Sequence, residues 1–174
     1  ILESDTEALI IEAGVPLKEV KIALGFNIRK IVGVVVSHSH GDHAKYVSEY
    51  EKEGISVYKS YEGRLPFDVY GNFFFKDFEL EHDVPCVGFY IRHPEIGVLV
   101  YASDTEYIKW RFKDINHILV EANYSDDLIE KDAVNREHVL KGHMSLKTAL
   151  DFISTNDNPT LKNVVLLHIS EKNG

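Results

Sequence analysis

The sequence is poor in cysteine and contains no long apolar run, and both absences narrow the class of protein. Cys86 is the one cysteine among 174 residues, so no internal disulfide can form, and a small buried residue in a reducing, cytoplasmic compartment is expected. No apolar stretch approaches the roughly 20 residues that span a bilayer, so no membrane partner is expected. Internal repeats and Pro/Ser-rich linkers are also lacking. These features predict one soluble domain over residues 1–174, long enough to bury a substantial core.

Basic residues are also in short supply. Lys and Arg total 19 against 28 Asp and Glu, which gives a formal net charge of −9. Strong nonspecific binding to nucleic acid relies on a basic field and is therefore disfavoured. A transient nucleic-acid substrate stays compatible, because bound divalent cations would offset part of the deficit and a local basic patch suffices. Lys141, Lys147 and Lys172 are candidates for that patch.

Three histidines and an aspartate fall within the six-residue segment His38-Ser39-His40-Gly41-Asp42-His43. The preceding run 31–36 is apolar and β-branched, which predicts a buried strand whose carboxyl end lies where open α/β folds place their sites. Neutral imidazoles and a carboxylate are typical ligands of catalytic metal sites. In an extended turn His38 and His40 can point the same way, whereas Asp42 and His43 diverge and can serve a second ion. A polar loop that is merely rich in histidine is the weaker alternative.

This motif, together with three later residues, resembles the pattern of the metallo-β-lactamase superfamily, the αββα sandwich hydrolases. The family pattern continues with a His after a strand, an Asp after another and a His after a last strand, and this chain has His82, Asp104 and His168 in that order. The resemblance spans roughly residues 8 to 171. It implies an α/β (α+β) fold with two mixed sheets and helices on the outer faces.

The resemblance also implies a dinuclear centre of two divalent metal ions, zinc or manganese, between which the sequence does not choose. A water or hydroxide between the ions would be the nucleophile, because two cations lower the pKa of a shared water and polarise the bond being cleaved. Asp42, Asp104 and His143 are assigned to catalysis. The resemblance implies that the first ion is held by His38, His40 and His82 and the second by Asp42, His43 and His168. Asp104 would bind both ions.

Segments of the C-terminal half resemble one branch of the superfamily, the YycJ-like (WalJ) proteins, whose relatives are described as DNA exonucleases. The short spacings on either side of Asp104 leave no room for the exosite arm of tRNase Z enzymes or the extra domain of β-CASP nucleases. Ala122 and Tyr124 depart from the Ser and His of the branch pattern. The residues that carry the resemblance are Glu121, Asn123, Gly142, His143, Ser145, His168, Ser170, Glu171 and Asn173.

Several polar residues outside the ligand set have two interpretations. His143 either donates a proton to the leaving oxygen or binds the phosphate, as in phosphodiesterase branches, or it caps or packs a helix start. Glu121 either orients a metal-ligand His or is a structural acceptor, and Asp83 has the same alternatives with the structural one favoured. The remaining histidines are expected to be structural: His93, His117 and His138.

Hydrophobic periodicity predicts a regular alternation of elements. The aromatic runs 73–75 and 107–112 are expected in the core or at its rim rather than as a base-stacking platform, with Tyr107 and Trp110 near the site entrance. Further segments are expected at both ends, because the first predicted strand corresponds to the second of the family fold. Strands are predicted over 7–13, 31–36, 55–60, 73–80, 87–92, 98–102 and 118–121 and before His168, and helices over 16–24, 43–53 and from 145 onward.

Together these features predict a dinuclear metal-dependent hydrolase, foremost a phosphodiesterase or DNA exonuclease-like nuclease acting on nucleic acid or a small phosphodiester. A small-molecule hydrolase for a cyclic nucleotide, lactone or thioester would suit the acidic surface better. A metal-stabilised binding module without turnover is the third alternative, and the complete ligand set disfavours it.

Overall fold

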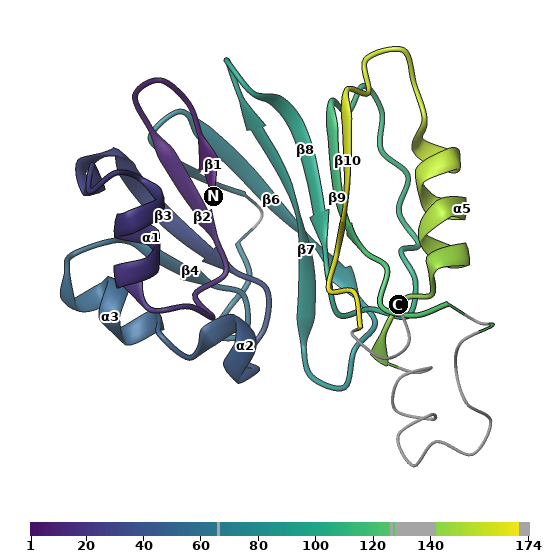
Figure 1. Cartoon of the computed structure of the whole chain (residues 1–174), viewed down its shortest axis with the longest axis horizontal. Helices are drawn as coiled ribbons and strands as arrows, with labels where there is room; N and C mark the ends of the chain where they lie inside the picture. Colours follow the sequence, from purple (N-terminus) through teal and green to yellow (C-terminus); the bar gives the residue numbers. More distant parts are fainter. Residues whose placement is uncertain (66, 126, 128–141, 171–174) are drawn as a thin grey trace.

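The computed structural model of the chain describes residues 1–65, 67–125, 127 and 142–170. The predicted positions Lys141, Lys172, His138, Glu171 and Asn173 lie outside these residues. In the part that is described, two β-sheets pack face to face, and helices cover the outer face of each sheet (Figure 1). The predicted αββα sandwich with two mixed sheets is therefore confirmed.

The first sheet comes from the N-terminal half and has the order β1-β2-β3-β4. Its strands β2, β3 and β4 run parallel, and the short β1 pairs antiparallel with β2. The bounds are β1 Leu2–Glu3, β2 Ala8–Ile11, β3 Ile31–Val36 and β4 Val57–Lys59.

The second sheet has the order β10-β9-β8-β7-β6-β5. Strands β8, β9 and β10 are parallel to one another, and the hairpin-connected β5 to β8 are antiparallel. The bounds are β5 Asp68–Tyr70, β6 Phe73–Leu80, β7 Cys86–His93, β8 Gly97–Ala102, β9 His117–Glu121 and β10 Asn163–Leu167.

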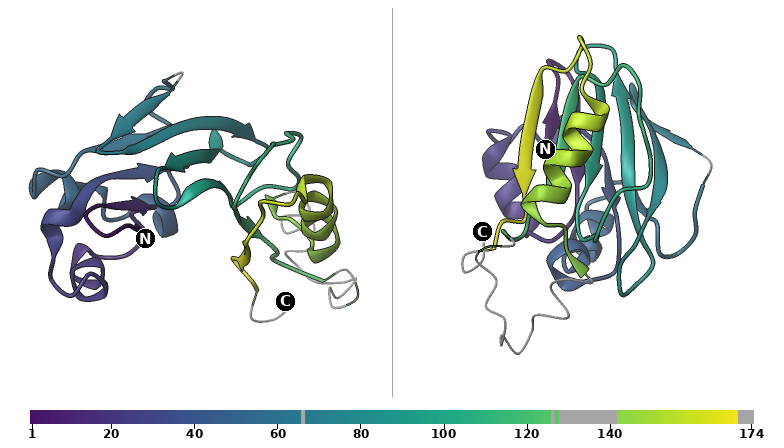
Figure 2. Two further views of the ribbon diagram at one scale, coloured as in Figure 1. Left: turned by 90° about the horizontal axis from the view of Figure 1, so that it is seen from above. Right: turned by 90° about the vertical axis from the view of Figure 1, so that its right-hand side faces the viewer.

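Helices α1 and α3 lie on the outer side of the first sheet, and α5 lies on that of the second, so the layers succeed one another across the view in Figures 1 and 2. Ser145 caps α5 as its side chain accepts a hydrogen bond from Thr148 N, which agrees with the predicted helix start. The helical segments are α1 Leu17–Ala23, the 3-10 turn Ile28–Lys30, α2 Gly41–Ala44, α3 Val47–Lys52 and α5 Leu146–Asn156. None of the described helices is both long and apolar enough to cross a membrane.

The helix predicted over 43–53 is wrong in one respect, because it is interrupted between α2 and α3. Ala13, just past β2, donates its N–H to the carbonyl of His43 at 2.7 Å, and its carbonyl accepts from the N–H of Tyr46 at 2.9 Å. These backbone bonds to a neighbouring segment replace helical ones. They also hold the histidine-rich turn against the end of β2.

Three apolar cores fill the spaces between the layers. Val20 and Tyr50 belong to the core under α1 and α3, and Phe75 and Phe89 belong to the core between the sheets. Phe152 of α5 belongs to the third core, on the outer face of the second sheet. Phe73 and Phe75 are almost fully buried, as predicted for that aromatic run.

Candidate metal centre

The predicted ligands lie where strands of the two sheets end, toward the bottom of the view in Figure 1, near α2 and the end of β10. Parallel strands in register finish at one edge, and Ala102 of β8 and Leu166 of β10 both pair with Val120 of β9. The residues just past these strands therefore meet. The strand ends supply His38 after β3, His82 after β6, Asp104 after β8, Glu121 at the end of β9 and His168 after β10.

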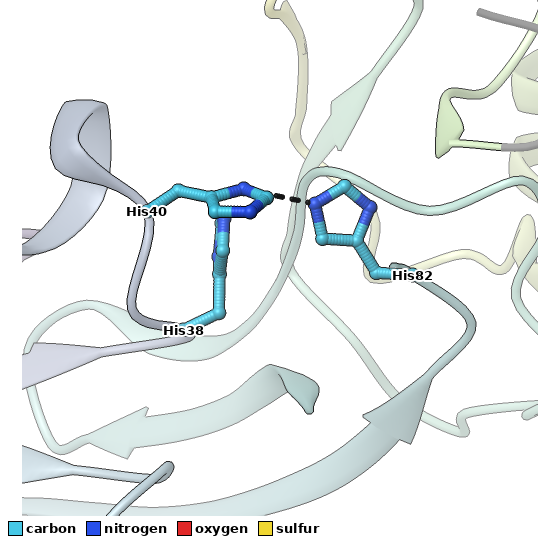
Figure 3. Close-up of side chains that lie close together, drawn as sticks. All are labelled: His38, His40 and His82. Atoms are coloured by element: carbon cyan, nitrogen blue, oxygen red, sulfur yellow. Dashed lines mark hydrogen bonds between the residues drawn. The ribbon is translucent and has the colours of Figure 1, made fainter. Parts of the chain in front are cut away.

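The first cluster consists of His38, His40 and His82, whose ring nitrogens lie within 4.8 Å of one another. His82 Nε2 and His40 Nδ1 are 3.3 Å apart, and Figure 3 shows these two rings turned toward each other. The ring centroid of His38 lies 4.7 Å from that of His40 and 5.0 Å from that of His82. The three imidazoles thus converge on one point.

The donor atoms of this cluster fit a cation. His38 is fully buried, and its Nε2 has no hydrogen-bond partner; the same is true of Nδ1 of His82. Burial lowers the pKa of both rings, that of His38 to about 3 with a further contribution from His43. A buried neutral imidazole without a partner carries a free-energy penalty that a metal ion removes, and the neutral ring is the form that binds metals.

A second cluster joins His43 to Asp104 and to His38 of the first cluster. His43 Nε2 lies 3.0 Å from Asp104 Oδ2, and the other carboxylate oxygen, Oδ1, lies 3.3 Å from His168 Nδ1. Asp104 is 3 % exposed. Its carboxylate therefore contacts His43 with one oxygen and His168 with the other, while it also lies within reach of His38.

His43 and Asp104 form an ion pair in the metal-free protein. Burial lowers the pKa of His43, but hydrogen bonds to Asp104 and Glu12 outweigh burial and raise it to about 10. Burial also opposes ionisation of Asp104, yet the hydrogen bond from His43 holds its carboxyl pKa well below the usual range. In this ion pair the nitrogen of His43 that faces Asp104 is Nε2. A metal ion bound at Nε2 would displace the proton from that nitrogen.

Glu121 connects the third cluster, which contains Asp104, His143 and His168. The Glu121 side chain is fully buried, and its Oε1 accepts from His143 Nδ1 at 2.7 Å and lies 3.1 Å from His168 Nδ1. The hydrogen bond with Glu121 raises the pKa of His168, although burial opposes it. The other carboxylate oxygen of Glu121, Oε2, accepts a hydrogen bond from the N–H of Thr105 at 3.0 Å. This is the geometry of an acceptor that orients two histidines, one of the alternatives predicted for this residue.

The two remaining acidic residues lie at the edge of the centre. The carboxylate of Asp42 is 3.5 Å from His43 Nε2, and its side chain is 64 % exposed. Among the described residues the three clusters do not include Asp42. Asp83 contacts both His82 and His40, at 3.1 and 3.4 Å, closer to the first cluster than its favoured structural interpretation required.

Two residues of the centre were missed by the sequence reasoning. Glu12, just past β2, lies 3.4 Å from His43 Nδ1 with one oxygen and accepts the N–H of Ser37 at 3.1 Å with the other. Cys86 is buried as predicted, but its sulfur also lies 3.7 Å from His38 Nδ1. An acidic residue that directly ends a buried apolar strand is the signal that points to Glu12.

The two described histidines that were given a structural interpretation lie outside the clusters. His93 is buried against Phe73 and Glu7, and His117 Nε2 bonds the carbonyl of Ile96 at 2.9 Å. Both belong to the second sheet, away from the strand ends that carry the ligands. Lys147, the described member of the suggested basic patch, is exposed on the first turn of α5.

Residues 1–94 match the family model described as the Metallo-beta-lactamase superfamily. No curated protein matches the sequence. The metallo-beta-lactamase fold protein YhfI from Bacillus subtilis aligns over 97% of this chain and 77% of its own, with 16% identity and a TM-score of 0.72. The short form of human tRNase Z aligns over 98% and 84%, with 16% identity and a TM-score of 0.66. A diphosphatase from the PhnP family aligns over 98% and 72%, with 13% identity and a TM-score of 0.66.

Proposed function

Because this chain belongs to the metallo-β-lactamase superfamily, we propose that it is a dinuclear metal-dependent hydrolase of phosphodiesters, most specifically a nuclease. One observation carries the proposal: the carboxylate of Asp104 contacts His43 and His168 and also lies in one cluster with His38. A carboxylate in that position suits a bridge between two ions. The first ion would be held by His38, His40 and His82, and the second by Asp42, His43 and His168.

Two divalent ions, zinc or manganese, would supply Lewis-acid polarisation of a phosphate oxygen and a water activated near neutral pH. The chain's own contribution is the placement and protonation of the groups around them. Glu12 orients the ring of His43 through a contact with its Nδ1, and Glu121 orients the ring of His168 in the same way. The side chain of Asp42 lies beside His43 and is mostly exposed, so Asp42 is the carboxylate best placed to exchange protons with water.

We assign His143 to the protonation of the leaving oxygen. Its Nδ1 is engaged by Glu121 at 2.7 Å, and the same nitrogen lies 3.8 Å from Asp104 Oδ1. With Nδ1 engaged in this way, Nε2 is the nitrogen that would pass a proton to the leaving group. The buried carboxylate of Glu121 thereby fixes the orientation of the ring that this role requires.

Three lines support phosphodiester cleavage over other hydrolyses. Two structures of the same fold are named as a tRNase and a diphosphatase. The resemblance to the YycJ-like exonucleases is carried in part by His143 and Glu121, which contact each other. Asn123, another carrier, donates its side-chain N–H to the carbonyl of His168 at 2.9 Å. The net charge of −9 favours the alternative of a small substrate such as a cyclic nucleotide, lactone or thioester.

The test is metal-dependent cleavage of end-labelled single- and double-stranded DNA and RNA, with bis-nitrophenyl phosphate beside them. His40→Ala is the inactive blank, and Ser39→Ala is its matched control because Ser39 lies between two ligands and is exposed. Cleavage that is lost in His40→Ala and kept in Ser39→Ala supports the nuclease. Cleavage of the small diester alone would restrict the substrate to small phosphodiesters. A protein that binds two metals and cleaves neither would refute phosphodiester hydrolysis.

Asp104→Asn separates an enzyme from a binding module. The substitution keeps the size of the side chain but removes the charge that contacts His43 and His168. Turnover should fall by at least about 100-fold in an enzyme. A binding module would keep its partner, as measured by pull-down with the wild-type protein as reference.

A further inference from the structure

A cavity of about 480 Å³ opens on the outer face of the second sheet, beside the strand that leads to His82. Its lining includes three aromatic residues, Tyr90, Trp110 and Phe112, and three basic residues that we call the rim, Arg64, Lys76 and Arg111. We call these six residues the aromatic groove. They come from β6, β7 and the segments after β4 and β8, so the fold and not a local sequence run assembles them.

Trp110 presents an exposed ring in a defined orientation. The residue is 43 % exposed. Its indole Nε1 donates to the carbonyl of Glu79 at 3.0 Å, which anchors one edge of the ring to β6. The rings of Tyr90 and Phe112 are stacked with an interplanar angle of 20°. The groove therefore offers flat apolar surface that is already ordered before a ligand arrives.

The rim is basic in a chain whose overall charge is −9. Two carboxylates also line the cavity, but both are paired with Arg64, Asp77 at 2.7 Å and Glu79 at 2.9 Å. With Lys76 and Arg111 included, the three basic and two acidic residues that line the cavity leave a net charge of +1. Aromatic rings beside cations are the surface on which bases of a single strand stack while their phosphates are attracted.

The groove borders a second cavity, of about 320 Å³, which shares Arg64 and Glu79 with it and also has Cys86 in its lining. The Cys86 sulfur lies 3.7 Å from His38 Nδ1. Along the chain, Glu79, which anchors Trp110, precedes His82 by three residues, at most about 11 Å of extended backbone.

We propose that the aromatic groove binds a base of single-stranded nucleic acid by stacking on Trp110, while a phosphodiester of the same strand lies at the metal centre. This inference rests on the proposed phosphodiesterase function and specifies its substrate as a polymer. A small phosphodiester would fill the centre without touching the groove. The groove, and not the centre, then sets the preference for single strands.

Binding is tested with the fluorescence of Trp110, which is the sole tryptophan of the chain. The metal-loaded protein is titrated with a short oligothymidylate whose phosphorothioate linkages resist cleavage, and an abasic strand of the same length is the matched ligand. Stacking predicts saturable quenching by the oligothymidylate and little quenching by the abasic strand. Equal quenching by both strands, or none by either, would overturn the proposal. This arm needs no turnover, so it decides the groove even where the hydrolase assay fails.

Kinetics give the second arm. In Trp110→Ala, the ratio of kcat/KM for single-stranded DNA to kcat/KM for bis-nitrophenyl phosphate should fall about tenfold. Phe26→Ala, which removes a 70 % exposed aromatic ring beyond α1, should leave the ratio at the wild-type value. Lys76→Glu tests the rim without removing a ring and should lower the same ratio. An unaltered ratio in Trp110→Ala and Lys76→Glu would refute the groove and leave the hydrolase standing. Failure of the wild type on both substrates would refute the hydrolase instead.

Discussion

Gly14 holds a position in which a single added methyl group should disable the metal centre. The residue comes after Glu12 and Ala13 at the end of β2, where the histidine-rich turn packs against the backbone. A Cβ atom on Gly14 would lie 1.6 Å from the carbonyl oxygen of Asp42 and 3.3 Å from the N–H nitrogen of His43. Both contacts are with backbone, which cannot rotate away as a side chain can.

The size of the effect can be worked from this geometry. The carbonyl of Asp42 must retreat by about 1.8 Å before its contact with the new Cβ reaches 3.4 Å. Overpacking of this kind costs about 3 kcal/mol of the free energy of unfolding, equivalent to a fall in Tm of about 6–12 °C. The turn that moves carries His38, His40 and His43. Because a misplacement of about 1 Å can cost 100-fold in rate, we expect Gly14→Ala to lose metal and activity together.

Gly41→Ala is the matched control. Gly41 lies inside the histidine-rich motif and begins α2, yet a Cβ on it would meet no atom within 4 Å. Its replacement should keep two metals and a wild-type Tm, or raise the Tm slightly, because alanine favours a helix more than glycine does. Metal content by mass spectrometry and Tm by calorimetry decide the comparison. If Gly14→Ala bound metal and melted like Gly41→Ala, the packing of the turn against β2 would be wrong.

Three further predictions concern the acceptor behind the histidines, the metals and the ion pair. Glu121→Gln should weaken binding of the second metal by about 10- to 100-fold, because an amide is a poorer acceptor for His143 and His168; calorimetric titration with zinc would contradict this if affinity were unchanged. Removal of metal by a chelator should lower the Tm by about 8–16 °C, since an ion at about 1,000 times its Kd contributes about 4 kcal/mol, whereas equal melting with and without chelator would argue against a metal-filled centre. In the metal-free protein the pairing of His43 with Asp104 raises the pKa of His43 from 6.5 to about 10, so its stabilisation is complete below pH 6.5 and is lost as the pH rises toward 10. Urea unfolding across that range should show the decline, and His43→Gln should show less of it.

The long elements of the fold could be predicted from the sequence because their periodicity is strong. The strand predicted over 73–80 matches β6, Phe73–Leu80, and the helix predicted from 145 begins at Leu146 behind its Ser145 cap. The short strands β1 and β5 were missed. Each has only two or three residues and depends on its neighbour for hydrogen bonds, so local periodicity cannot indicate it. The break between α2 and α3 has the same origin, since it is made by Ala13, about 30 residues away along the chain.

Some residues of the candidate centre could likewise be predicted from the sequence, whereas others could not. Its histidines and Asp104 were predicted because their residue types and order are specific to metal ligation, and the structure brings His38, His40, His43, His82, Asp104 and His168 together in overlapping clusters. The contact of Cys86 with His38 was not predicted, and that of Asp83 with His82 was the less favoured of two alternatives, since each depends on how a strand end or turn is placed in space. A residue that contacts a metal ligand without binding the metal has no characteristic spacing in the sequence by which it could be found.

The backbone of the centre adopts uncommon conformations at the ends of its strands. Five non-glycine residues of the described chain have a positive φ, and three of them lie in the centre: Glu12, Asp104 and His168, at 68°, 56° and 53°. Each is placed directly beyond or near the end of a strand, and each such conformation costs about 1–3 kcal/mol unless the surroundings hold it. The holding contacts are present, because Glu12 accepts from Ser37 N, Asp104 accepts from Ser103 Oγ, and the carbonyl of His168 accepts from Asn123. Aspartate and histidine adopt such a backbone more often than most residues other than glycine, but both occur at many other positions of the chain, so residue type alone does not locate it. The concentration of positive φ values at these three residues is an independent structural indication that the strand ends are shaped for a site.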